Sequence, residues 1–130
     1  MLVNTTMPVT HLHIEASSYC NARCPGCPRN AYGYPLEGFY KQAHLHPSRL
    51  REILQEFSDV KSILYCGNHG DPMMSPHIVD LCPDNIKVSI ATNGGIGRIS
   101  DYEQLARNKV HITFGIDGLE DTNHLYRQGV

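Results

Sequence analysis

The sequence lacks the features that would tie it to a membrane, a secretion route or a nucleic acid. Nowhere do about 18 apolar residues run together, and the N-terminal segment MLVNTTMPVT has neither a basic leader nor the apolar core of a signal peptide. With 11 lysines and arginines against 13 aspartates and glutamates, the formal net charge is -2, so no basic excess favours nucleic acid. These absences predict a cytoplasmic protein with neither a membrane nor a nucleic acid as partner.

Cysteine is also scarce, and its distribution is uneven. The 130 residues contain five cysteines, an odd number, and three of them fall within eight residues in the segment SYCNARCPGC. Thiols are kept reduced in the cytoplasm, so clustered cysteines there indicate metal binding or redox chemistry rather than a disulfide framework. We therefore expect these three cysteines to be functional, and we expect Cys66 and Cys82 to be small buried hydrophobic residues.

The apolar pattern predicts one α/β domain in which strands alternate with helices. Expected strands cover residues 9–16, 62–67, 86–92 and 110–117, and the second of them is expected to be fully buried. Expected helices cover residues 46–59 with Ser48 as N-cap, 75–82 with only one to two turns, and 100–108, and a further helix starts in DTNHLYRQG with Thr122 as candidate N-cap. Repeated prolines and glycines between residues 17 and 47 predict a long loop. This alternation favours parallel strands joined by right-handed crossovers.

Each expected strand is followed by a chemically unusual segment. The cysteine segment follows the first strand, GNHGDP (67–72) the second, ATNGG (91–95) the third and IDG (116–118) the fourth. Parallel α/β folds place their ligands at the carboxyl ends of the strands. We therefore expect four loops to converge on one site, with His69 of GNHGDP as a candidate lining residue.

The cysteine segment has the spacing C-x3-C-x2-C, formed by Cys20, Cys24 and Cys27. Structural zinc sites and ordinary iron–sulfur sites use four protein ligands, whereas three thiolates leave one metal position open for chemistry. Two alternatives stay open on spacing alone. The cysteines could lie in a loop without a metal, or His11 or His13 could complete a zinc site.

Together, the four segments resemble the N-terminal part of a radical S-adenosylmethionine (SAM) enzyme. The similarity covers roughly residues 10–130, and it is nearest in style to members that modify peptides or proteins and carry a C-terminal SPASM-type domain. It implies the first four strands of a partial (β/α)6 barrel, so that residues 1–130 would be the incomplete N-terminal portion of a radical SAM core domain. The runner-up function is a noncatalytic α/β module that binds zinc or a cluster.

The resemblance implies two cofactors, a [4Fe-4S] cluster and SAM. Cys20, Cys24 and Cys27 would hold three irons, and the fourth iron would take the amine and carboxylate of SAM. Reductive cleavage of SAM would give methionine and a 5′-deoxyadenosyl radical that removes a hydrogen atom from a substrate, with a peptide or protein as the candidate. The electron would come from a one-electron reductant of the flavodoxin or ferredoxin type.

The loop after the second strand matches the family's Gly-Gly-Glu-like loop. The resemblance implies that Asp71 accepts the methionine amine, and that Gly67 and Gly70 let the backbone approach the ligand. Asp-Pro is also ordinary turn chemistry, which is the alternative interpretation of Asp71.

Three further residues match SAM-contacting positions. Thr92 and Asn93 would approach the ribose or the carboxylate of SAM, and Arg127 would pair with the methionine carboxylate, to which a guanidinium is suited. Asp117 would face the substrate or end its strand.

Two departures from the family pattern carry expectations of their own. The position before the last cysteine is often aromatic in the family and touches adenine, but here it is Gly26, so adenine would be held by the backbone or by Tyr19 or Tyr32. Only four of six barrel strands are visible, which would leave an unpaired apolar edge on the last strand. We therefore expect a truncated reading frame or one part of a split protein whose missing C-terminal half is a partner.

Overall fold

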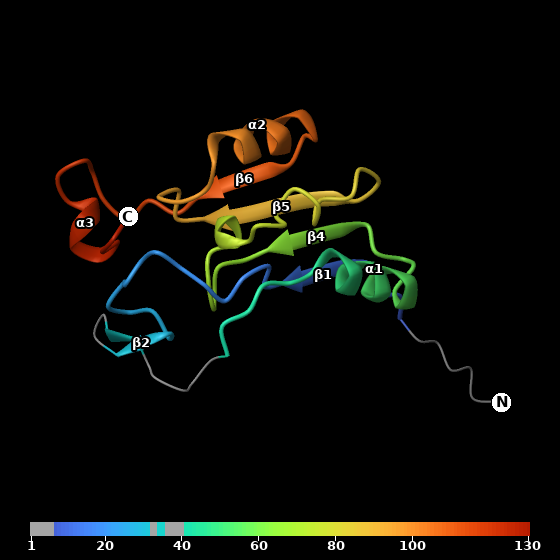
Figure 1. Ribbon diagram of the computed structural model, residues 1–130, viewed down its shortest axis with the longest axis horizontal. Coiled ribbons are helices and arrows are strands. Elements are labelled where there is room, and N and C mark those ends of the chain that lie inside the picture. The colour runs from blue at the N-terminus through green and yellow to red at the C-terminus, as the bar shows by residue number, and fades with distance from the viewer. Residues whose placement is uncertain (1–6, 32–33, 36–40) are drawn as a thin grey trace.

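The computed structural model is built around a sheet of four parallel strands (Figure 1). It describes residues 7–31, 34–35 and 41–130. The strands are β1 (His11–Ile14), β4 (Ser62–Tyr65), β5 (Lys87–Thr92) and β6 (His111–Phe114), which lie in this order across the sheet. Since every pair is parallel, all four carboxyl ends meet at one edge. The predicted parallel α/β sheet of four strands is confirmed.

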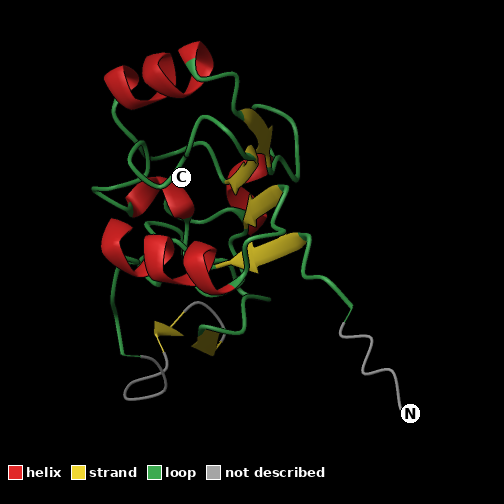
Figure 2. Cartoon of the chain, turned by 90° about the vertical axis from the view of Figure 1, so that its right-hand side faces the viewer, coloured by secondary structure: helices red, strands yellow, loops and turns green. Residues whose placement is uncertain are grey.

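Two longer helices lie against one face of this sheet. α1 (Pro47–Glu56) precedes β4 and α2 (Ile99–Arg107) precedes β6, and both lie on the same side of the strands in Figure 2. The shorter elements are the 3-10 helix η1 (Pro72–Met74), the helix α3 (Asn123–Tyr126) and an antiparallel hairpin of β2 (Asn30–Ala31) and β3 (Tyr34–Pro35). Within the described residues, no helix is both long and apolar enough to cross a membrane.

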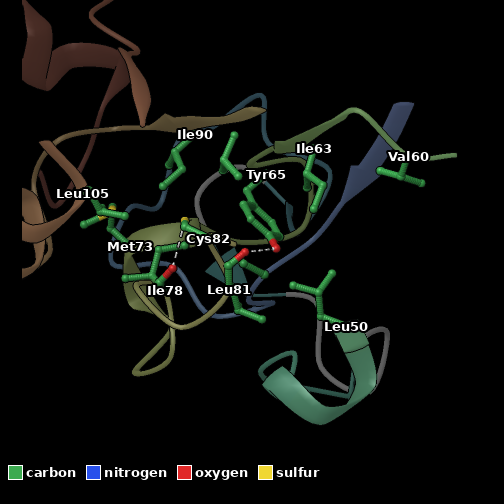
Figure 3. Close-up of a cluster of buried hydrophobic side chains, with 12 residues drawn as sticks. Leu50, Val60, Ile63, Tyr65, Met73, Ile78, Leu81, Cys82, Ile90 and Leu105 are labelled. Carbon is green, nitrogen blue, oxygen red and sulfur yellow. Dashed lines mark hydrogen bonds between the residues drawn. The ribbon is translucent and has the colours of Figure 1, made fainter. Parts of the chain in front are cut away.

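The hydrophobic core lies between the sheet and these helices (Figure 3). Ile63 and Tyr65 of β4 and Ile90 of β5 have at most 1% of their surface exposed. They belong to one cluster with Leu50 of α1 and Leu105 of α2. Burying a large aliphatic side chain contributes about 1.5–3 kcal/mol, so this face fixes the helices on the sheet and sets the positions of the strand ends.

The opposite face of the sheet is more open. Leu64 of β4 is 39% exposed, and its cross-strand neighbour His13 on β1 is also exposed. Thr113 of β6 is exposed on this side as well. The expectation that residues 62–67 form a fully buried strand is therefore wrong, because α1 and α2 pack on one face only and burial alternates along β4.

The predicted helix at residues 75–82 is also wrong. The segment forms only turns, with one hydrogen bond of α-helical spacing, from Leu81 N to His77 O at 3.0 Å. Pro76 and Pro83 bound the segment, and the residue before a proline is driven away from helical dihedrals. Only about one turn can form between them.

The N-cap of α1 lies two residues earlier than the sequence suggested. His46, not Ser48, is the N-cap, and its Nδ1 accepts a hydrogen bond from Ser48 N at 3.3 Å. Pro47 occupies the first helical position, where its missing N–H costs nothing. The cap therefore has to be the residue before the proline.

Candidate functional site

A cavity of about 500 Å³ opens at the carboxyl ends of the four strands. Its floor is the open face of the sheet, including His13, Leu64 and Thr113. Its rim comes from the loops after all four strands, so the expected convergence of these loops is observed. The lining includes the predicted cluster ligands and all the residues predicted to contact SAM, namely Cys20, Cys24, Cys27, Gly67, Gly70, Asp71, Thr92, Asn93 and Arg127. What these residues bind stays a prediction.

The three cysteines are free thiols, and two consecutive tight turns carry Cys24 and Cys27. Cys27 N donates to Cys24 O at 3.0 Å, and Asn30 N donates to Cys27 O at 2.9 Å, which folds the loop back on itself. Burial is the main cause that raises the pKa of Cys20, and the negative charge of Asp71 adds to it. Three thiols on one folded loop at the wall of a cavity fit the donor set of an iron–sulfur cluster with one open position.

The histidines proposed for a zinc site are separated by the structure. His13 lines the cavity with the cysteines, whereas the ring of His11 lies 2.7 Å from Thr10 Oγ1 and outside the lining. In the described ranges, no group of three or more His, Cys, Asp or Glu side chains is arranged to hold a single metal ion. His69 of the GNHGDP loop, a candidate lining residue, is not part of the lining.

Asp71 is 3% exposed, and its carboxylate is fully engaged within the protein. Oδ1 accepts hydrogen bonds from Met73 N at 2.9 Å and from Thr92 Oγ1 at 2.8 Å. Oδ2 accepts one from Asn93 N at 2.8 Å. Asp71 therefore caps η1 and ties the loop after β4 to the end of β5. This supports the turn interpretation of the Asp-Pro pair, while binding of the methionine amine stays a prediction.

Another loop packs so closely against residue 70 that only glycine fits there. A Cβ at this position would lie 2.0 Å from Ser17 O, which no side chain can occupy. The next residue confirms how close the two loops run, because Asp71 N donates to Tyr19 O at 2.7 Å. The close backbone approach at Gly70 thus joins the loop after β4 to the cysteine loop.

Arg127 lies at the cavity beside the end of β6. A Cβ on Gly115 would stand 2.7 Å from its Nη2, and its Nε forms an ion pair with Asp117. Asp117 is thereby explained as the partner of Arg127. A guanidinium has five N–H donors in a planar fork, so this ion pair leaves donor capacity toward the cavity.

Tyr126 is a lining residue that the sequence reasoning missed. Its hydroxyl lies 3.1 Å from the point where a Cβ on Gly26 would stand, so an aromatic ring fills the space beside Gly26. Tyr19, the expected aromatic, stacks on His44 with ring centroids 4.6 Å apart and does not line the cavity. Tyr32 lies outside the described residues. Only the docking of α3 on the cysteine loop brings Tyr126 here, and no local pattern signals that docking.

Glu15 is the second residue that was missed. Its carboxylate accepts hydrogen bonds from Cys66 Sγ at 3.0 Å, Asn68 N at 3.1 Å and His69 N at 3.3 Å. Burial and the neighbouring carboxylate raise the pKa of Cys66 to about 11. Cys82 is a small core residue as predicted, but Cys66 lines the cavity as a hydrogen-bonded thiol. The only sequence signal was the place of Glu15 at the end of a strand before the cysteine loop.

Comparison with known proteins finds a family match and similar folds. The family model described as the Radical SAM superfamily matches residues 14–129. Native anSMEcpe with bound AdoMet is 22% identical, with a TM-score of 0.67, over 94% of this chain and 36% of that chain. BtrN in complex with AdoMet and 2-DOIA is 17% identical, with a TM-score of 0.58, over 78% of this chain and 42% of that chain. No curated protein matches the sequence.

The two solved structures support the fold, since both match most of this chain with TM-scores above 0.5 at low sequence identity. This chain spans well under half the length of either of them. The family match begins at the last residue of β1 and runs through the cysteine loop to Gly129, so it covers well over half of the chain. The chain therefore belongs to the radical SAM superfamily, whose cofactors are a [4Fe-4S] cluster and SAM.

Proposed function

We propose that this chain forms the cofactor-binding portion of a radical SAM enzyme, as the N-terminal part of its core domain. One observation carries the proposal: Cys20, Cys24 and Cys27 line the same cavity as the loops from the other three strand ends. A ligand held at the open position of a cluster on this loop would lie among polar groups of four loops. The site thus suits a cosubstrate that binds the metal and the protein together.

The residues divide the work within the cavity. The three thiols would hold the cluster, and Arg127 would offer its remaining N–H donors to a carboxylate, as charge-assisted pairs of this kind are strong. Asp71 keeps the ends of β4 and β5 in register through its hydrogen bonds to Thr92 and Asn93. When bound, the cofactors supply reductive cleavage of SAM and a 5′-deoxyadenosyl radical that abstracts hydrogen.

The partners follow from the family resemblance. The proposal includes a one-electron donor of the flavodoxin or ferredoxin type and an organic substrate, with a peptide or protein as the class to test first. We assign no substrate contact to the four loops.

Anaerobic reconstitution with iron and sulfide tests the proposal. We expect a [4Fe-4S] cluster with its broad visible absorbance, a change in its EPR spectrum on adding SAM, and weak or no 5′-deoxyadenosine from this chain by itself with dithionite. The variants Cys20→Ala, Cys24→Ala and Cys27→Ala should lose the cluster. Cys66→Ala, which removes a thiol from the same cavity, should keep it.

Three other outcomes of this experiment would contradict the proposal, and each can be told apart from the others. Stoichiometric zinc without sulfide would replace the proposal with a zinc-binding module. If a cluster forms but its EPR spectrum does not change on adding SAM, the chain would be a cluster-binding module instead. Retention of the full cluster by any of the three cysteine variants would contradict the ligand assignment.

A further inference from the structure

The side chain of Asn93 points to the cysteine loop. Asn93 directly follows β5, and its backbone N–H is held by Asp71. Its amide nitrogen Nδ2 lies 3.6 Å from Cys20 Sγ and 2.9 Å from Asn21 Oδ1. An amide has two N–H donors, so these two acceptors occupy both of them.

The orientation of this amide is fixed by its neighbours. Asn93 Oδ1 accepts a hydrogen bond from Gly95 N at 2.8 Å. Asn21 donates its own Nδ2 to Gly95 O at 3.4 Å and to Gly129 O at 3.2 Å, which leaves its Oδ1 facing Asn93. Rotating the Asn93 amide by half a turn would place its Oδ1 against Asn21 Oδ1 and its Nδ2 against the N–H of Gly95. The donor therefore has to face the sulfur.

The same network limits what Asn93 can do for another ligand. Its backbone N–H and all three polar positions of its amide already have partners in the protein. Reaching the ribose or carboxylate of SAM would break part of this network, so the sulfur contact is the role that the contacts favour.

We infer that Asn93 raises the reduction potential of the cluster by donating a hydrogen bond to the sulfur of Cys20. This inference rests on the proposed function, because it needs the cluster on Cys20. The electron added on reduction increases the negative charge on the cluster and its sulfurs. A fixed N–H dipole stabilises the reduced form more than the oxidised form, and hydrogen bonds to sulfur are among the known determinants of cluster potential. Asn93 is thus a positioning residue for the redox step.

The test is a redox titration of the reconstituted chain without SAM, in which the EPR signal of the reduced cluster is monitored. Asn93→Ala removes the donor, and Asn93→Asp keeps the shape and the acceptor for Gly95 N but cannot donate. Both variants should shift the midpoint potential to more negative values, with the aspartate at least as far because it adds charge. Asn68→Ala is the matched control, since Asn68 Nδ2 donates at 3.7 Å to Cys66 Sγ in the same cavity. Its potential should equal that of the wild type.

Each other result counts against the inference. If both Asn93 variants bind the cluster at the wild-type potential, the contact does not tune it. If Asn68→Ala shifts the potential equally, the effect belongs to the cavity and not to this bond. If neither Asn93 variant assembles a cluster while Asn68→Ala does, Asn93 builds the loop and the tuning role is rejected. If the wild type assembles none, the proposed function fails first and the inference with it.

Discussion

At the scale of single residues, the buried carboxylate of Asp71 is the strongest link between two loops of the site. Asp71→Ala would leave Met73 N, Thr92 Oγ1 and Asn93 N without their acceptor. A buried donor left unpaired costs about 1–3 kcal/mol, so we expect the free energy of unfolding to fall by about 3 kcal/mol or more in urea denaturation. Asp80→Ala, which removes an exposed carboxylate, should change it little. Equal effects of the two substitutions would mean that Asp71 is not a structural clamp.

Glu15 controls the chemistry of a neighbouring thiol. Glu15→Gln removes a negative charge 3.0 Å from Cys66 Sγ, so the pKa of Cys66 should fall from about 11 toward its ordinary value. More thiolate at mildly alkaline pH means faster alkylation, and we expect a several-fold rise in the rate for Cys66 by iodoacetamide labelling and peptide mass mapping. Cys82, whose pKa of about 12 comes from burial, is the internal control. A parallel rise at both thiols would indicate a loosened fold instead.

At the scale of elements, the sequence predicted strands better than helix boundaries. The first strand was found because its apolar and polar residues alternate, and the later three because short β-branched or apolar runs end at glycine, asparagine or aspartate. Residues 75–82 look equally apolar, but Pro76 and Pro83 permit only turns there. Pro47 likewise moved the cap of α1 to His46. These errors share one cause: proline restricts its predecessor, and the apolar pattern does not report that restriction.

The contact between α3 and the cysteine loop yields a prediction about packing. Gly26→Phe would place a ring where Tyr126 now lies, since even a Cβ there would be 3.1 Å from the Tyr126 hydroxyl. We expect a lower free energy of unfolding in urea for Gly26→Phe alone. The loss should be smaller when Tyr126→Ala has first cleared the space, giving a coupling of about 0.5–3 kcal/mol. Additive effects would show that α3 does not pack on this loop.

At the scale of the whole molecule, the location of the site could be predicted from the sequence, but the contacts among its residues could not. Parallel pairing forces the carboxyl ends of all strands to one edge, so four marked loops had to meet there. The contacts of Tyr126 and Glu15 depend on how distant loops dock, and the direction of the Asn93 amide depends on Asn21 and Gly95. Residue types and spacing carry no information about such tertiary contacts.

The edge of the sheet at β6 yields a prediction about self-association in solution. β6 lies at the edge of the sheet, and exposed apolar residues follow it, including Ile116 at 71% and Leu119 at 77% exposure. Exposed apolar edge strands tend to pair with other chains. We expect concentration-dependent self-association in sedimentation velocity, and less of it in the double variant Ile116→Lys and Leu119→Lys. Ile99→Lys, at an equally exposed position on α2, should leave it unchanged. A monomer at all concentrations, or an equal effect of Ile99→Lys, would remove the β6 edge as the cause.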